Sequence, residues 1–163
     1  MTAPITALSS TAAARAEALA LATFDIEAAA VLGLKDRLNE TFAQTVSLVL
    51  SIEGRVVVMG MGKSGHVGRK IAATLASTGT PAMFVHPAEA SHGDLGMVTA
   101  QDLVLMISYS GESQEINAIL PVLKRLGVPL VAMTSSPASS NSRITKPGPP
   151  AAWNWLTSAL PLG

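Results

Sequence analysis

Four short apolar runs alternate with segments of helical composition, and this alternation constrains the fold more than any other feature of the chain. The runs cover residues 56–59, 82–85, 103–107 and 129–133. A continuous apolar run is typical of a strand covered on both faces, and strands alternating with helices favour right-handed crossovers in a parallel sheet. The sequence therefore predicts an α/β three-layer sandwich with a parallel, flavodoxin-like sheet in the strand order 2-1-3-4.

The predicted helices precede and connect these strands. The first is rich in alanine and leucine, the best helix formers, and is followed by Gly33. The second places apolar residues at three- and four-residue spacing before Gly54. Between the strands we expect two crossover helices and one short irregular or helical piece. The predicted segments are 11–32, 34–50, about 65–77, about 114–126 and, for the short piece, 87–93.

Composition limits the class of protein and of partner. The chain has 163 residues, 48% of them hydrophobic and none of them cysteine, which fits one globular domain without a disulfide scaffold. Eleven basic and eleven acidic residues give a net charge of zero, so we expect no nucleic-acid partner. The apolar stretch 16–32 is interrupted by Glu17, Asp25 and Glu27, and residues 1–5 lack a signal-peptide charge. We therefore expect no membrane partner and a cytoplasmic location.

The loop after the first predicted strand, residues 60–65, matches G-x-G-x-x-G and contains Gly-Lys-Ser. A Walker A loop is disfavoured because Val57 occupies the position of its first glycine. A dinucleotide site is disfavoured because the second strand ends without the carboxylate that would hold a ribose. Two interpretations remain. Either Ser64 and the following helix N-terminus bind an anion, or the loop is a tight strand-to-helix turn with a surface lysine.

A second loop follows the third predicted strand and carries three serines before a helix, Ser108, Ser110 and Ser113. Hydroxyl groups and free backbone N–H groups can surround a phosphate with neutral donors. In the expected strand order this loop and Ser64 face one crevice, between strands one and three. The alternative is that the serines cap the helix, although one cap does not require three of them.

A third cluster, residues 86–95, contains two histidines and two carboxylates. Their spacing fits no standard zinc pattern, so we expect no metal site. His92 is either an ordinary loop histidine or, because imidazole side chains suit proton transfer near neutral pH, a catalytic group if it reaches the crevice.

Four motifs together resemble a known family. They are Gly-Met-Gly-Lys-Ser-Gly-His (60–66), Ala-Ser-Thr-Gly-Thr-Pro (76–81), the run from His86 to Met97, and Ser-Tyr-Ser-Gly-Glu-Ser (108–113). They resemble the SIS (sugar isomerase) domain and, more narrowly, arabinose-5-phosphate isomerases of the KpsF/GutQ type. The resemblance implies interconversion of D-ribulose 5-phosphate and D-arabinose 5-phosphate through an enediol, in Kdo and lipopolysaccharide biosynthesis. It also implies a cytoplasmic homotetramer with no cofactor.

The resemblance assigns roles to individual residues. Lys63, His92 and Glu115 are implied around the sugar as catalytic residues, with His92 reaching a neighbouring subunit's site. Glu115 fits the role of base with reservation, because the first turn of a helix favours the ionised carboxylate. Its alternative role is a carboxylate that stabilises the helix start. The residues implied to bind the substrate phosphate are Ser64, Ser108, Ser110 and Ser113.

The resemblance ends after about Asn141. We expect a helix over 1–33, the sugar-phosphate-binding domain over 34–142, and an atypical proline- and tryptophan-containing tail over 143–163 without CBS domains. The prolines at 147, 149 and 150 exclude a central strand there, because proline lacks the N–H group of a ladder. We therefore expect a reading frame truncated or shifted near residue 142 and a fold incomplete at its C-terminal side.

The missing segment bears on stability and function. Without a fifth strand the fourth becomes an unprotected edge, so we expect aggregation or weak folding. The leading functional hypothesis is a pentose-phosphate isomerase domain whose activity in this shortened form is open. The alternatives are a phosphosugar-binding module without turnover and an inactive fragment that associates with longer subunits.

Overall fold

The computed structural model describes residues 8–134, 156 and 157 of the 163-residue chain. The described part divides into two compact units, the first ending at Arg37 and the second beginning at Leu38. The first unit contains helix α1 (Ser10–Gly33) and the 3-10 turn η1 (Lys35–Arg37). Ser9 caps α1, because its side-chain oxygen accepts a hydrogen bond from the Ala12 N–H group at 3.3 Å. The helix predicted for 11–32 is confirmed.

Helix α1 buries none of its residues within its own unit. Large apolar side chains such as Leu19, Phe24, Ile26 and Val31 are all exposed. None of the helices in the described part of the chain is both long and apolar enough to cross a membrane.

The second predicted helix begins later than expected. Helix α2 spans Glu40–Ser51, whereas the apolar spacing suggested a start at Leu34. Asn39 has an extended backbone, and its side-chain oxygen accepts hydrogen bonds from the N–H groups of Thr41 and Phe42 at 3.0 and 3.4 Å. This cap starts the helix at residue 40 and separates it from η1. The predicted start is therefore wrong by six residues, or about 1.7 turns.

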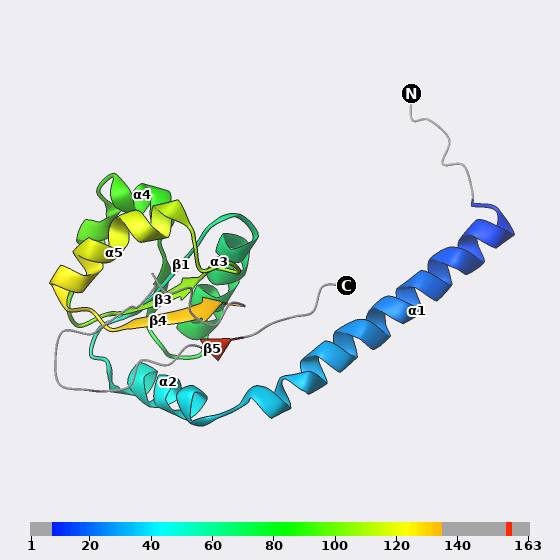
Figure 1. The fold of residues 1–163 in the computed structure, drawn as a ribbon, viewed down its shortest axis with the longest axis horizontal. Coiled ribbons are helices and arrows are strands. Elements are labelled where there is room, and N and C mark those ends of the chain that lie inside the picture. The colour runs from blue at the N-terminus through cyan, green and yellow to red at the C-terminus, as the bar shows by residue number, and fades with distance from the viewer. Residues whose placement is uncertain (1–7, 135–155, 158–163) are drawn as a thin grey trace. The chain divides into compact units, whose positions relative to one another are not determined.

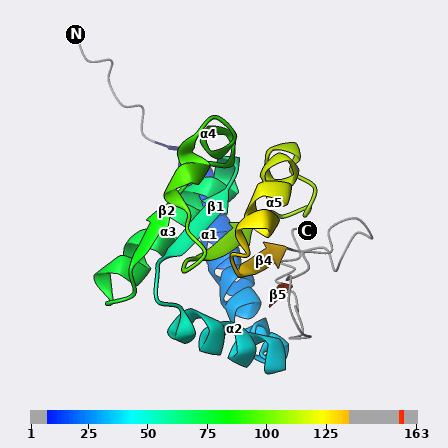
Figure 2. The same ribbon diagram turned by 90° about the vertical axis from the view of Figure 1, so that its left-hand side faces the viewer.

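The second unit is built around a parallel sheet, shown in Figures 1 and 2. Its strands lie in the order β2-β1-β3-β4-β5, and all neighbouring pairs are parallel. The predicted order 2-1-3-4 is confirmed. The strands are β1 (Val56–Gly60), β2 (Ala82–Phe84), β3 (Leu103–Ile107), β4 (Leu130–Thr134) and β5 (Leu156–Thr157).

Strand β5 corrects one expectation. We expected β4 to be an unprotected edge, but Met133 pairs with Leu156 and Thr134 pairs with Thr157. Two residues of the tail therefore cover the carboxyl end of β4. The segment 143–150, where the prolines exclude a central strand, lies outside the described residues. The division of the chain at residues 33 and 142 likewise stays a prediction.

Helices cover both faces of the sheet, which confirms the predicted three-layer sandwich. The residues of β1 alternate between two hydrophobic clusters, with Val57 and Met59 in one and Val56 and Val58 in the other. The first cluster joins the sheet to α4 (Pro87–Ser91), the 3-10 turn η2 (Asp94–Met97) and α5 (Gln114–Leu126). The second joins it to α2 and to α3 (Gly62–Ser77). Figure 1 shows α4 and α5 together on one side of the sheet and α2 on the other.

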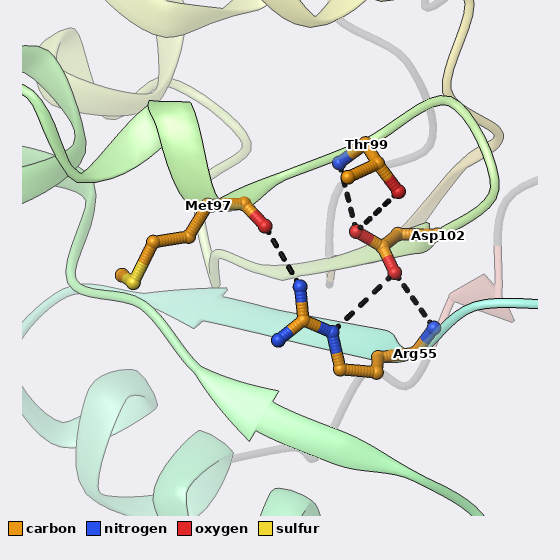
Figure 3. Close-up of polar contacts among 4 residues, drawn as sticks. All are labelled: Arg55, Met97, Thr99 and Asp102. Atoms are coloured by element: carbon orange, nitrogen blue, oxygen red, sulfur yellow. Dashed lines mark hydrogen bonds and ion pairs between the residues drawn. The ribbon is translucent and has the colours of Figure 1, made fainter.

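A buried carboxylate ties the amino ends of β1 and β3 together (Figure 3). The Asp102 side chain is 1% exposed and accepts hydrogen bonds from the N–H groups of Arg55 and Thr99 at 2.7 and 2.8 Å. It also pairs with the Arg55 guanidinium, which donates to the Met97 carbonyl. Burial alone would raise the pKa of Asp102, but these hydrogen bonds and the Arg55 charge lower it below its ordinary value.

Candidate active site

The turn after β1 brings helix α3 against the end of the strand. Only Met61 separates Gly60, the last residue of β1, from Gly62, the first of α3. A Cβ atom on Gly65 would lie 2.7 Å from the Gly60 carbonyl oxygen, closer than real Cβ atoms approach. The glycine pattern therefore serves close helix–strand packing, as the tight-turn alternative required. The same turn also places Ser64 in the first turn of α3.

The turn after β3 is shaped by its own serines. The Ser108 Oγ accepts a hydrogen bond from the Gly111 N–H group, and the Ser110 Oγ accepts one from the Glu112 N–H group, both at 3.2 Å. The Ser113 Oγ accepts from the Ile116 N–H group at 3.4 Å and caps α5. The capping interpretation is thus confirmed for Ser113, while Ser108 and Ser110 hold the turn before it.

The two turns meet in one pocket of about 270 Å³. Ser64 reaches it from the turn after β1, and Ser108, Ser110 and Ser113 reach it from the turn after β3. Because β1 and β3 are adjacent parallel strands, both turns lie at the same carboxyl edge of the sheet. The structure therefore brings together all four serines that the sequence singled out. The other lining residues are Met61, Ile107, Tyr109 and Ile116.

Two helices begin at this pocket. Ser64 is the third residue of α3, and Ser113 is the N-cap of α5. A helix N-terminus carries unpaired N–H groups and a partial positive charge, and both favour an anion. Among the described residues, the pocket lining contains hydroxyl and apolar side chains and no basic one. Lys63 is next to Ser64 in α3 and is exposed, so it borders this lining without belonging to it.

Glu115 is connected to the pocket through Ser113. The Ser113 hydroxyl donates a hydrogen bond to Glu115 Oε2 at 2.7 Å. The pKa of Glu115 is lowered by hydrogen bonding to its own backbone N–H group, by the Ser113 hydroxyl and by the charge of His86. This direction agrees with the expectation from the start of a helix, where the ionised carboxylate is favoured. Glu115 is therefore ionised at neutral pH.

His86 is a neighbour of Glu115 that the sequence did not assign to this site. It follows β2 and precedes α4, and its ring makes an edge contact with Phe84 at 6.5 Å between centroids. Its charge interaction with Glu115 arises because α4 and α5 pack together on one face of the sheet. The position of His86 at the end of a strand was a usable signal, but its partner lies on a distant helix, and no spacing in the sequence indicates it.

His92 is placed apart from the pocket lining. It is exposed at the C-terminal end of α4, where its backbone N–H group donates to the Glu89 carbonyl at 2.9 Å. Within the described residues no group of three or more His, Asp or Glu side chains is arranged to hold a metal ion.

Comparison with known proteins identifies the family of the chain. The SIS domain model matches residues 49–154, a range that includes the whole pocket. Arabinose 5-phosphate isomerase KdsD of Shigella flexneri is 58% identical over 118 residues, which are 72% of this chain and 36% of that protein. The KdsD of Pseudomonas aeruginosa is 58% identical over 117 residues with the same two coverages. The chain thus spans about a third of the length of these curated relatives.

A solved structure supports the same assignment. That of E. coli CFT073 c3406 in complex with arabinose 5-phosphate superposes with a TM-score of 0.75 and 44% sequence identity. The match covers 84% of this chain and 71% of the other. The architecture, the pocket at the β1–β3 edge and the family match agree: this chain is a member of the SIS domain family.

Proposed function

We propose that the chain forms the sugar-phosphate-binding part of an arabinose-5-phosphate isomerase, which interconverts D-arabinose 5-phosphate and D-ribulose 5-phosphate. The observation that carries this proposal is the convergence of two serine-bearing turns and two helix N-termini on one pocket. The KdsD relatives named as arabinose 5-phosphate isomerases and the structural neighbour that contains the sugar phosphate support the substrate class.

In this proposal the phosphate lies against the hydroxyl groups of Ser64, Ser108, Ser110 and Ser113. Serine hydroxyls are neutral donors, so they bind the dianion through hydrogen bonds rather than through an ion pair. The partial positive charge of the α3 and α5 N-termini supplies the electrostatic attraction. The apolar side chains of Ile107 and Ile116 reduce access of water to these hydrogen bonds.

The reaction moves a proton between adjacent carbons of the sugar. Glu115, the second residue of α5, removes the proton from C2 of the aldose and returns it to C1, while the proton of the O2 hydroxyl passes to O1, so that the carbonyl moves from C1 to C2. The Lys63 ammonium stabilises the negative charge that develops on the enediolate oxygen. No cofactor takes part in this scheme, because the electron pair stays within the sugar. A carboxylate with a lowered pKa is a weak base, so this assignment needs a device that strengthens Glu115.

The proposal extends to assembly and pathway. By family resemblance the chain acts as a cytoplasmic homotetramer in Kdo and lipopolysaccharide biosynthesis, with His92 contributing to a neighbouring subunit's site. The exposure of His92 at the end of α4 supports a role outside its own pocket. The apolar side chains exposed on α1 support self-association. Light scattering of the purified chain tests the assembly directly.

The deciding experiment incubates the full chain with D-arabinose 5-phosphate in deuterated water. Proton NMR then detects the ketose product and the loss of the C2 proton signal of the aldose as deuterium replaces it. Calorimetry on the same sample measures binding. Turnover with exchange supports the isomerase, and binding without exchange supports a sugar-phosphate-binding module. The absence of both binding and turnover supports an inactive fragment. The last two outcomes contradict catalysis by this chain.

A pair of variants tests the pocket within that experiment. Ser64→Ala removes a hydroxyl from the pocket, and we expect it to weaken sugar-phosphate binding about tenfold, the value of one hydrogen bond to a charged group. Ser77→Ala is the matched control, because Ser77 is exposed at the other end of α3 and donates to the Thr74 carbonyl of its own helix. Equal loss in both variants would contradict the assigned pocket.

A further inference from the structure

The hydroxyl proton of Ser113 already has an acceptor. A serine hydroxyl has one proton to donate, and that of Ser113 goes to Glu115 Oε2 at 2.7 Å. The direction of this bond is fixed, because an ionised carboxylate only accepts. The backbone N–H group of Ile116 donates to the same Oγ at 3.4 Å. Ser113 nevertheless lines the pocket, so it stands between the proposed anion site and Glu115.

The other three pocket serines differ from Ser113 in this respect. Ser108 and Ser110 accept hydrogen bonds from backbone N–H groups within their turn, which leaves their own protons to be donated. Among the described residues no side-chain hydrogen bond of Ser64 is found. These three hydroxyls can turn towards an anion without giving up a bond to a charged group. Ser113 can do so only by leaving Glu115.

A phosphate dianion offers only acceptor oxygens, so it competes with Glu115 for this one proton. We propose that Ser113 couples the two sites: phosphate binding turns the Ser113 hydroxyl from Glu115 to the phosphate, and Glu115 becomes a stronger base only when the pocket is occupied. The proton stays bonded to Ser113 throughout, and only its acceptor changes. The N-cap bond from Ile116 can persist, because it uses a lone pair of the Oγ.

This inference rests on the proposed function and supplies the device that it needs. Without phosphate, Glu115 keeps its Ser113 donor, its own N–H group and the nearby charge of His86. With phosphate it loses the first of these and also experiences the repulsion of the dianion. Both changes favour the protonated carboxyl group. The enzyme then removes a proton only from a sugar whose phosphate is in place, which restricts reaction with unphosphorylated sugars.

Coupling between two sites is reciprocal, and this gives the test. If phosphate weakens the hold of Glu115 on Ser113, weakening that hold must strengthen phosphate binding. Four full-length proteins form a double-mutant cycle: wild type, Ser113→Ala, Glu115→Gln and the double variant. Inorganic phosphate is the probe, and calorimetry gives its affinity. The cycle separates the shared proton from simple charge repulsion, since repulsion by Glu115 operates with either residue at position 113.

We expect Glu115→Gln to tighten phosphate binding on the order of tenfold when Ser113 is present and about threefold or less when it is alanine. Equal gains in the two backgrounds would overturn the coupling while leaving the phosphate site intact. Absence of phosphate binding by the wild-type chain would overturn the site itself, and the proposed function with it. If the alanine variant fails to fold, Ser113→Gly replaces it, since glycine costs little at an N-cap.

A second measurement reads Glu115 directly. Carbon-13 labelling of glutamate side chains allows NMR titration of Glu115 with and without inorganic phosphate, with Glu115→Gln identifying its signal. We expect the pKa of Glu115 to rise on phosphate addition in the wild type and in Ser113→Thr, which keeps the hydroxyl. The rise should be smaller in Ser113→Ala. A rise of the same size in all three proteins would overturn the coupling, whether or not the substitutions at position 113 change stability.

Discussion

The Thr134 hydroxyl donates a hydrogen bond to the Tyr109 carbonyl at 3.2 Å, so the end of β4 holds the serine turn that follows β3. Thr134 is 3% exposed. The Ser108 N–H group adds a second connection, donating to the Met133 carbonyl at 3.0 Å. The position of the turn therefore depends on the neighbouring strand as well as on its own serines.

Thr134→Val should weaken anion binding several-fold and lower the free energy of unfolding by about 1 kcal/mol, because the Tyr109 carbonyl loses a donor. Thr134→Ser is the control and should retain most of both properties. Phosphate calorimetry and urea unfolding measure the two effects. If valine leaves phosphate affinity unchanged, Thr134 has no part in positioning the turn.

Gly65→Ala should destabilise the second unit by roughly 1–3 kcal/mol, because its Cβ would press on the Gly60 carbonyl oxygen and push α3 away from β1. The displacement also moves Ser64, so phosphate binding should weaken. Gly96→Ala is a suitable control, since a Cβ there has no atom within 4 Å. Thermal unfolding of both variants checks the prediction, and equal stability would contradict the close helix–strand contact.

Asp102→Asn should lower the free energy of unfolding by about 2–3 kcal/mol at pH 7. The N–H groups of Arg55 and Thr99 donate to different carboxylate oxygens of Asp102, and asparagine keeps only one of these acceptors, so one N–H group faces the amide nitrogen. The difference should depend on pH. The pKa of Asp102 is lower in the folded than in the unfolded chain, so on acidification the unfolded chain binds the proton first. The stabilisation by the Asp102 carboxylate is therefore complete above about pH 5.

An aspartate in the unfolded chain takes up its proton at about pH 4. As the pH falls below this value, the stabilisation decreases, and it is lost once the pH is below the lowered pKa of folded Asp102. The difference between wild type and Asp102→Asn should therefore narrow between about pH 5 and the acid limit of folding. Urea unfolding at several pH values measures it. The comparison cancels the contributions of other carboxyl groups, and a difference independent of pH would refute the role of the charge.

Asn39→Ala should lower stability by about 1 kcal/mol, because the first N–H groups of α2 lose their side-chain acceptor. Asn39→Asp keeps an acceptor and should be close to neutral. Chemical unfolding distinguishes the two. A neutral alanine variant would show that tertiary packing of α2, rather than its cap, fixes where the helix begins.

The elements that the sequence predicted well have local signals. Helix α5 spans Gln114–Leu126 as expected, because Ser113 caps its start and Gly127 ends it with a positive φ of 69°. The strands were evident because burial on both faces requires uninterrupted apolar runs. The start of α2 was missed because apolar spacing continues back to Leu34, whereas one asparagine side chain decides where the helix begins.

The site divides in the same way. The meeting of Ser64 with the serine turn could be predicted, since strand order alone determines which loops are adjacent. The Ser113 bond to Glu115 depends on side-chain rotamers, and the interaction of His86 with Glu115 depends on how α4 packs on α5. Neither leaves a pattern along the chain. Charge and hydroxyl content therefore indicated the kind of ligand, but not which of the groups around it interact with one another.

Strand β1 has consequences for anyone who wishes to alter the ligand preference of this protein. All five of its residues are buried, its amino end is fastened through Arg55 to Asp102, and its carboxyl end leads into the crowded glycine turn. A shift of one residue in its alignment with β3 would swap Val57 and Val58 between the two layers and loosen both ends at once. Redesign of the pocket is therefore best confined to exposed positions of the serine turn, such as Tyr109, while the sequence of β1 is left unchanged.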